Sequence, residues 1–329
     1  MSSLPATYKA WQVQKAGDLL RLETFQLTQP GPSEILVKVL ACGVCHSDVG
    51  MQKGEFGPVH PRVPGHELVG DVVAVGEGVT KYSGGERVGG AWHGGQFQSC
   101  ENGTINGVTR NGGYAEFCLL REEAVVRVPV DLDPAEAAPL LCAGVTVFNG
   151  IRKMEIAQGS LVAIQGLGGL GHLAVQFAKK MGYRVAAISS GSSKKDFAFQ
   201  LGADYYIDAT VDSPVEKLKE MGGAALVVAT APNAKAISVL TGGLAIRGKL
   251  LVLAPVGNIE INSLHLIGGG CSVHGWPSGH ALDAEEAIQF SKEHDIKCMV
   301  EKFAMEDAPK AVDCMMANQV RFRSVLVMP

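Results

Sequence analysis

Residues 161–181 read LVAIQGLGGLGHLAVQFAKKM, and this stretch decides the fold. Its first five residues, 161–165, form a short apolar run that is typical of a buried strand. Residues 166–171 follow as G-x-G-x-x-G, and residues 173–181 have helical spacing. A glycine turn in this context allows a pyrophosphate to approach the backbone and the positive end of the helix. We therefore predict a dinucleotide site here, against the alternative of a plain glycine turn between a strand and a helix. Its expected contacts come from Gly166, Gly168, Gly169 and Gly171.

Strands and helices alternate on the C-terminal side of this turn, and such alternation indicates a doubly wound parallel sheet. The expected strands are 161–165, 184–189, 205–207, 225–229, 249–253 and 272–275. The expected helices between them are 173–181, 194–201, 214–221 and 234–240. A helix over 283–293 and a strand over 323–327 then close the chain.

The end of the second of these strands bears on the choice of cofactor. In NAD sites an acidic residue about 20 positions beyond the glycines holds the ribose 2′-hydroxyl. Here the count from Gly169 reaches Ser189, within ISSGSSKK, and no acid is present. Ser189, Ser190 and Lys194 are suited to a 2′-phosphate, so we expect NADP(H) to be preferred over NAD(H). The alternative is that the serines only cap the next helix.

The N-terminal part is rich in strands and turns. Apolar, β-branched runs bounded by Gly, Pro and Asp predict strands over 8–13, 35–39 and 68–75. Residues 91–111 are polar, glycine-rich and only weakly periodic, which predicts a long loop.

Composition excludes several classes of protein. The chain has 329 residues, which suggests two domains, and a formal net charge of −4. This charge and an aromatic content of 6% argue against nucleic-acid binding. Because no apolar run reaches a membrane span and Met1–Pro5 lacks the features of a signal peptide, we expect a cytoplasmic protein without a membrane partner.

The cysteines indicate a metal site rather than a disulfide framework. Eight cysteines are spread over a long chain, and most are expected to be buried thiols. A catalytic zinc needs about three N, S or O ligands and an open fourth position, and Cys45, His66 and Cys142 are candidates. Cys42 and Cys45 form a C-x-x-C, but no second such pair exists to complete a zinc ribbon.

Several motifs together resemble the zinc-dependent alcohol dehydrogenase branch of the medium-chain dehydrogenase/reductase superfamily, nearly end to end. The motifs are GVCHSD at 43–48, GHE at 65–67, NGGYAE at 111–116, LCAGVT at 141–146 and GLGGLGH at 166–172. The resemblance implies an α/β protein with a GroES-like, β-rich catalytic domain at 1–150. It further implies a Rossmann NADP(H)-binding domain at 151–281, a return to the catalytic domain at 282–329, and an active site in the cleft between the two domains.

The resemblance also implies roles for individual residues. Cys45, His66 and Cys142 match the catalytic zinc ligands, and Glu67 matches a carboxylate that can exchange with the water of the metal. Asp48 matches the group that orients the ligand histidine, and Ser47 the hydroxyl that takes the substrate's proton. The remaining matches are to the cofactor, at His46, Thr146, Ala254 and Val256, and to the substrate pocket, at Trp92, Phe97 and Trp276.

The chain departs from the family pattern at two places. Many relatives end the proton relay with a histidine where this chain has Gly50, and His60 is a distant substitute. Relatives usually also carry a four-cysteine lobe for a structural zinc, of which only Cys100 is present. We therefore expect one catalytic zinc and no structural zinc. Because that lobe often supports subunit contacts, the assembly state is open, with a homodimer as one candidate.

We expect a zinc-dependent reductase of small aldehydes or ketones that prefers NADPH and also oxidises alcohols. The alternative is a biosynthetic reductase of iminium or conjugated C=C bonds on the same scaffold, which the missing relay histidine would fit. A non-catalytic, cofactor-binding regulator is a third candidate, and the complete ligand set argues against it.

Overall fold

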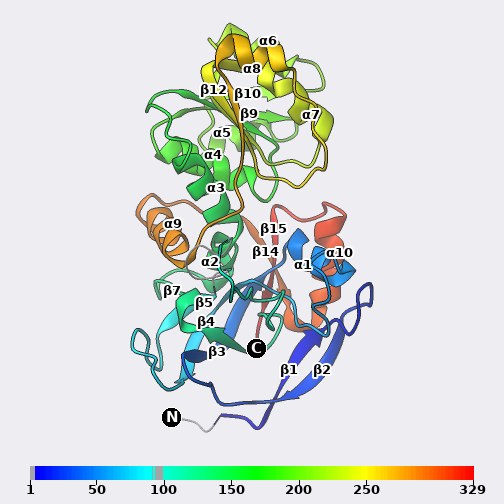
Figure 1. The fold of residues 1–329 in the computed structure, drawn as a ribbon, viewed down its shortest axis with the longest axis vertical. Coiled ribbons are helices and arrows are strands. Elements are labelled where there is room, and N and C mark those ends of the chain that lie inside the picture. Colours follow the sequence, from blue (N-terminus) through cyan, green and yellow to red (C-terminus); the bar gives the residue numbers. More distant parts are fainter. Residues whose placement is uncertain (1–3, 91, 93–98) are drawn as a thin grey trace. The chain divides into compact units, whose positions relative to one another are not determined.

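The computed structural model describes residues 4–90, 92 and 99–329. By their internal contacts the residues divide into two compact units (Figure 1). The first consists of Met1–Cys142, Gly279–Lys292 and Lys297–Pro329, and the second of Ala143–Ser278 and Glu293–Ile296. The units change after Cys142 and after Ser278, whereas the resemblance implies boundaries after residues 150 and 281, the first of which falls inside the helix Ala143–Arg152.

The first unit is built on a seven-stranded sheet with the order β14-β15-β3-β4-β5-β7, in which β6 also pairs with β3. A separate antiparallel pair is formed by β1 (Thr7–Gln12) and β2 (Arg21–Gln26). The strands of the sheet are β3 (Glu34–Gly43), β4 (Glu67–Val75), β5 (Arg87–Gly90), β6 (Phe117–Arg121), β7 (Val125–Arg127), β14 (Val300–Ala304) and β15 (Arg323–Val327). The helices are α1 (His46–Lys53), α2 (Pro134–Ala137), α9 (Ala281–Glu293) and α10 (Ala308–Met316), with 3₁₀ turns η1 (Glu122–Ala124), η2 (Ala138–Leu141) and η4 (Met305–Asp307).

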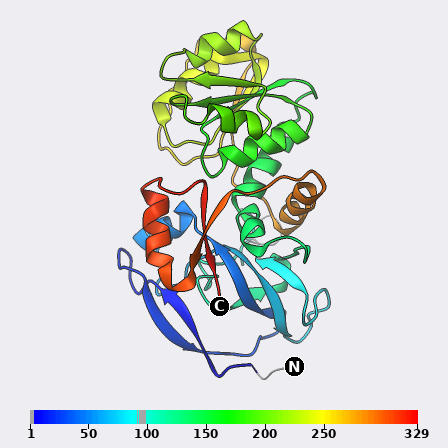
Figure 2. The ribbon, with the colours of Figure 1, turned by 180° about the vertical axis from the view of Figure 1, so that it is seen from behind.

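The end of the chain completes this sheet. The last strand, β15, lies antiparallel to β3, with Leu326 opposite Cys42, and parallel to β14 (Figure 2). The backbone N–H of Val44 donates to the carbonyl of Ser324 at 2.9 Å. Both edges of the largely apolar β3 are paired: β4 lies along one edge, whereas β6 and, at residues 41–43, β15 lie along the other.

The second unit contains a six-stranded parallel sheet with the order β10-β9-β8-β11-β12-β13. Figures 1 and 2 show helices on both of its faces, so the doubly wound parallel sheet is confirmed. The strands are β8 (Leu161–Gln165), β9 (Arg184–Ser189), β10 (Tyr205–Asp208), β11 (Ala224–Ala229), β12 (Leu244–Val252) and β13 (Ser272–Gly275). The helices are α3 (Ala143–Arg152), α4 (Gly171–Lys180), α5 (Lys195–Gln200), α6 (Pro214–Glu220), α7 (Ala234–Val239) and α8 (Ser263–Gly269), with a 3₁₀ turn η3 (Leu240–Gly243).

Most expected elements are present, with small shifts at their ends. β8, β9, β13 and β15 begin and end where the sequence predicts, whereas β12 begins at Leu244 rather than at residue 249. The structure adds elements that the sequence analysis did not predict: the helices α1, α2, α3, α8 and α10 and the strands β2, β5, β6, β7 and β14. Residues 99–111 of the expected long loop contain turns and one isolated bridge, between Asn106 and Arg110. Within the described part of the chain, no helix has the length and apolar character needed to cross a bilayer.

Candidate metal centre and cofactor site

The candidate metal centre begins where β3 turns into α1. Cys45 takes extended backbone angles at the N-cap of α1, and its N–H donates to Asp48 Oδ2 at 2.9 Å. An acidic group in the first turn both satisfies a free N–H and lies at the positive end of the helix. The start of the helix therefore holds one oxygen of the Asp48 carboxylate.

His66 and Glu67 are presented by the loop that enters β4. Gly65 has a φ of +100°, a conformation that favours glycine, and its N–H donates to Asp48 Oδ1 at 3.1 Å. The next residue, His66, is completely buried, and Glu67 is the buried first residue of β4. Cys142 comes from a third segment, at the C-terminal end of η2.

The structure brings these residues together. One potential ligand atom from each of Cys45, His66, Glu67 and Cys142 lies within 4.8 Å of the others. Nδ1 of His66 lies 3.1 Å from Asp48 Oδ1, which assigns the ring proton to that nitrogen. Nε2 of His66 is then left with a free lone pair, and it is buried with no hydrogen-bond partner among the described residues. Two sulfurs and an unpartnered buried imidazole nitrogen fit a tetrahedral zinc ion with one open position.

A buried ion pair lies beside this cluster. Arg323, the first residue of β15, donates through a terminal guanidinium nitrogen to Glu67 Oε1, which lies 4.0 Å from His66 Nε2. A Cβ at Gly43 would overlap Glu67 Oε2, so glycine at this position makes room for the carboxylate. Arg323 was not among the residues predicted from the sequence, and the signal that could have indicated it is an arginine at the start of a mostly apolar strand.

The electrostatics of the cluster favour a cation. Burial raises the pKa of Glu67 to about 7, and the nearby Arg323 guanidinium opposes this. The Cys142 thiol and, more weakly, His66 hold the pKa of Cys45 well below its usual value, whereas Cys45 and burial raise the pKa of Cys142. The thiolate form is thus favoured at Cys45 and opposed at Cys142. A bound divalent cation would favour the thiolate form of both residues.

Of the residues expected around the substrate, Ser47 and Trp92 lie beside the candidate ligands. The half-buried Ser47 has its Oγ 3.8 Å from Cys45 Sγ. The Trp92 ring stands edge-on to His66, with centroids 4.9 Å apart, and Phe56 contacts Trp92 in turn. Trp276 lies in the second unit, where its indole N–H donates to the Ser278 carbonyl at 2.7 Å. Phe97 lies outside the described residues.

The two positions of the expected proton relay differ in their surroundings. Gly50 is buried in α1, and a Cβ there would come within 2.9 Å of Glu55 Oε2 and 3.3 Å of Phe56. His60 is half-buried, and its Nε2 has no hydrogen-bond partner among the described residues. The space next to Gly50 is therefore taken by the side chains of Glu55 and Phe56.

In the second unit, the expected cofactor residues gather at the carboxyl edge of the sheet. The glycine turn follows β8, Ser189 ends β9, and residues 254–256 follow β12. Gly166 has a φ of +94°, and a Cβ at Gly171 would overlap the Gly166 carbonyl oxygen, so both positions require glycine. Gly168 is exposed with open space beside it, and no side chain caps α4. Such an uncapped helix end beside an open turn fits a pyrophosphate.

Other expected cofactor contacts lie on different elements. Lys194 donates from Nζ to the Leu167 carbonyl at 3.0 Å, so its side chain lies across the glycine turn. Ser189 and Ser190 are partly exposed at the same edge. The buried Thr146 of α3 makes a hydroxyl contact of 3.2 Å with Ser278, and His46 is the exposed first residue of α1, in the first unit.

Comparison with known proteins identifies the family. Residues 31–130 match the model of the alcohol dehydrogenase GroES-like domain, and residues 169–315 match that of the zinc-binding dehydrogenases. A relative from Penicillium expansum, alcohol dehydrogenase patD, is 51% identical over 99% of both chains. The chain belongs to the zinc-type alcohol dehydrogenases of the medium-chain dehydrogenase/reductase superfamily. This alcohol dehydrogenase is therefore an oxidoreductase with a GroES-like domain and a Rossmann-type sheet, as the sequence predicts.

Two solved structures similar to this alcohol dehydrogenase contain nicotinamide cofactors. Acetophenone reductase from Geotrichum candidum in complex with NAD has a TM-score of 0.86 and 28% identity over 99% of this chain and 98% of that one. The enzyme titled CAD from Helicobacter pylori complexed with NADP(H) has a TM-score of 0.84 and 25% identity over 98% of both chains. Structures with the same fold are thus known in complex with either dinucleotide.

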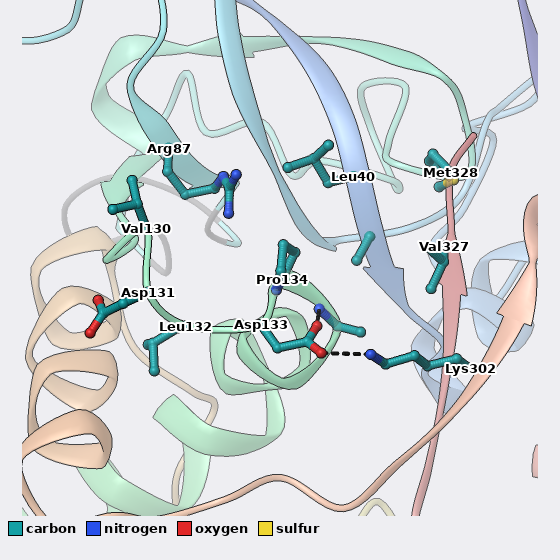
Figure 3. A pocket seen from close by; sticks show the side chains of 12 residues that line it. Leu40, Arg87, Val130, Asp131, Leu132, Asp133, Pro134, Lys302, Val327 and Met328 are labelled. Carbon is teal, nitrogen blue, oxygen red and sulfur yellow. Dashed lines mark hydrogen bonds and ion pairs between the residues drawn. The ribbon is translucent and has the colours of Figure 1, made fainter.

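A separate surface cavity of about 620 Å³ in the first unit contains none of the expected site residues (Figure 3). Its charged side chains are paired, as in the contact of 2.6 Å between Lys302 Nζ and Asp133 Oδ2. Asp133 also caps α2 through the Ala135 N–H, and Arg87 pairs with Asp71 at 2.5 Å. These groups are used within the fold, and we assign the cavity no role in the reaction.

Proposed function

We propose that this alcohol dehydrogenase is a zinc-dependent enzyme that transfers hydride between NADP(H) and a small aldehyde or ketone, mainly in the direction of carbonyl reduction. The observation that supports this most is the cluster of Cys45, His66 and Cys142, with the buried and unpartnered Nε2 of His66. In the proposed assignment these three residues hold one zinc ion per chain. When bound, zinc supplies a Lewis acid that polarises the oxygen of the substrate.

The residues of the chain have distinct proposed tasks around that ion. Asp48 fixes the tautomer and the ring plane of His66. Glu67, paired with Arg323, places a carboxylate beside the ligands. Ser47, whose hydroxyl is 3.8 Å from Cys45 Sγ, gives a proton to the oxygen of the reduced product and accepts it in the reverse direction. Trp92, packed against His66, contributes an apolar wall that excludes water.

For the cofactor, we propose that the glycine turn and the start of α4 bind the pyrophosphate. Ser189, Ser190 and Lys194 bind the 2′-phosphate of NADP(H), and this assignment is supported by the absence of an acid at position 189 and by the reach of Lys194 across the turn. His46 is assigned to the pyrophosphate, and Thr146, Ala254 and Val256 to the nicotinamide.

A cytoplasmic location is also proposed. All eight cysteines are unpaired, which fits a reducing compartment. A homodimer is the proposed assembly, and light scattering coupled to size-exclusion chromatography tests it.

A substrate panel tests the proposed reaction. The purified enzyme, loaded with zinc, is assayed with aliphatic and aromatic aldehydes, ketones, and conjugated and iminium substrates, each with NADPH and NADH. We expect reduction of carbonyl groups to alcohols, which product analysis by mass spectrometry identifies. Saturated carbonyl products from conjugated substrates, with no reduction of simple aldehydes, would instead support the second candidate, a reductase of C=C or iminium bonds.

A further inference from the structure

The NGGYAE segment at 111–116 has no part in the function proposed above, yet it is bound closely to the loop that presents His66. The N–H groups of Gly112, Gly113 and Tyr114 donate to the carbonyls of Val63, Gly65 and Pro64 at 2.8, 2.7 and 3.0 Å. In return, the Val63 N–H donates to Asn111 Oδ1 at 3.1 Å. A Cβ at Gly112 would overlap the Gly65 carbonyl oxygen, so the two backbones approach as closely as glycine permits.

Tyr114 extends this contact to the metal centre. Its side chain is completely buried, and its ring packs against Gly65, where a Cβ would lie 2.5 Å from Tyr114 Cδ1. Its hydroxyl lies 3.1 Å from Asp48 Oδ2. Burial, together with the Asp48 charge, raises the pKa of Tyr114 well above its usual value. The hydroxyl therefore stays protonated and donates a hydrogen bond to the carboxylate.

The partners of Asp48 show what this hydroxyl does. Oδ2 accepts from the Cys45 N–H and the Tyr114 hydroxyl, whereas Oδ1 accepts from the Gly65 N–H and faces His66 Nδ1. Both oxygens are therefore held by donors from three different segments. Without the hydroxyl, Oδ2 would keep one donor, and the carboxylate could rotate away from the plane in which it meets the imidazole.

We propose that Tyr114 is a positioning residue of the metal centre, which acts through Asp48 to hold the His66 ring with Nε2 directed at the metal. This inference rests on the metal site of the proposed function. The hydroxyl contributes to metal affinity through Asp48, its hydrogen-bond partner in the structure.

The test compares two buried tyrosines of the same core. Tyr82 is nearly as buried as Tyr114, and its hydroxyl donates to the Val125 carbonyl at 2.7 Å, with no partner at the metal centre. Zinc affinity of the wild type, Tyr114→Phe and Tyr82→Phe is measured by competition with a chromophoric chelator. We expect about a tenfold weaker affinity for Tyr114→Phe, since outer-shell partners of metal-binding histidines affect affinity by about 10–100-fold. Tyr82→Phe should bind zinc as the wild type does.

Two further measurements separate positioning from general stability. In the Asp48→Asn background, Tyr114→Phe should change zinc affinity less than twofold, because the hydroxyl acts through the carboxylate. The absorption spectrum of the cobalt-substituted protein should shift in Tyr114→Phe and not in Tyr82→Phe. If Tyr114→Phe does not fold, 3-fluorotyrosine at position 114 keeps the shape of the ring and makes the hydroxyl a stronger donor, and the cobalt spectrum should again shift.

The outcomes distinguish the two proposals. A wild-type protein that binds no zinc would overturn the proposed function and this inference together. A wild-type protein that binds zinc, with the same affinity and cobalt spectrum in Tyr114→Phe, would overturn only the role of Tyr114. An unchanged cobalt spectrum with 3-fluorotyrosine at position 114 would also overturn only the role of Tyr114.

Discussion

Among single residues, Cys142 is the proposed ligand that comes last in the chain, from the end of η2. Cys142→Ser removes a thiolate and leaves two protein ligands, which are too few for tight zinc binding. We expect zinc content to fall below about a tenth of the wild-type value and carbonyl reduction to be lost. NADPH binding is retained, because the residues assigned to the pyrophosphate and the 2′-phosphate, at 166–171 and 189–194, belong to other segments. Metal analysis and NADPH fluorescence titration measure the two effects. Cys314→Ser, at a half-buried thiol in α10, is the control, and equal zinc content in both variants would contradict the ligand assignment.

Two substitutions of Ser47 test whether its hydroxyl transfers a proton. Ser47→Ala should lower kcat for aldehyde reduction by about 10²–10⁴-fold, because it removes the group assigned to proton transfer. Zinc content and cofactor affinity should be unchanged. Ser47→Thr keeps a hydroxyl and should retain more of the activity. The assay requires that chemistry limits turnover, which a deuterium isotope effect with deuterated NADPH verifies, and wild-type turnover in Ser47→Ala would argue against a relay at this residue.

Ser189 tests the proposed preference for NADP(H). With NADPH, charge-assisted hydrogen bonds to the 2′-phosphate should give at least about a tenfold preference in kcat/KM over NADH, which corresponds to about 1.4 kcal/mol. Ser189→Asp should reverse the order by placing a carboxylate next to the phosphate. Ser213→Asp, at the N-cap of α6, adds the same charge elsewhere in the unit and should leave the preference unchanged. If the wild type has the same kcat/KM with NADH as with NADPH, Ser189 and Ser190 are only part of a helix cap.

At the scale of elements, the metal centre depends on how closely β3 and β4 approach. Gly43 ends β3 directly opposite Glu67, the first residue of β4. Gly43→Ala would place a methyl group on the Glu67 carboxylate, which the buried contact with Arg323 keeps from moving away. We expect a loss of about 1–3 kcal/mol in the free energy of unfolding, as for other overpacked sites.

Urea denaturation of the metal-free protein measures this loss. Gly84→Ala is the matched control, because Gly84 has nothing within 4 Å of its Cβ position, and its stability should change by less than about 0.5 kcal/mol. A Gly43→Ala protein as stable as the control would mean that Glu67 and Arg323 rearrange easily.

For the whole molecule, the number of metal ions follows from where cysteines and histidines gather. In residues 4–90, 92 and 99–329, the cluster at Cys45, His66, Glu67 and Cys142 is the one group of three or more potential ligands found. Cys100 is exposed and lies apart from it. We expect one zinc per chain by inductively coupled plasma mass spectrometry of protein expressed with zinc. Two zinc ions per chain would show that a second, structural site exists.

Local signals in the sequence were sufficient for the parallel sheet of the second unit. Strands such as 161–165 are buried on both faces of a parallel sheet, so they appear as continuous apolar runs with sharp ends. The glycine turn is equally local, because its strand, turn and helix are consecutive. The α3 helix was missed because nine of its ten residues are buried, which removes the polar face that helical periodicity needs. The α1 helix has only eight residues, which is too short for a clear periodic signal.

The sequence by itself determined the parallel sheet, the glycine turn and, through motifs of a few residues, the set of candidate ligands. Only the tertiary structure decided what surrounds those ligands. Arg323 meets Glu67 across 256 positions of the chain, and Tyr114 meets Asp48 across 66. The arginine at the start of β15 and the NGGYAE motif mark the two residues, but neither signal identifies the partner. The partner depends on the fold, in which β15 pairs with β3 and the 111–116 segment packs on the loop before His66. Hydrogen bonds and ion pairs of this kind act over a few ångströms in space, and only the folded chain brings such distant residues within that range.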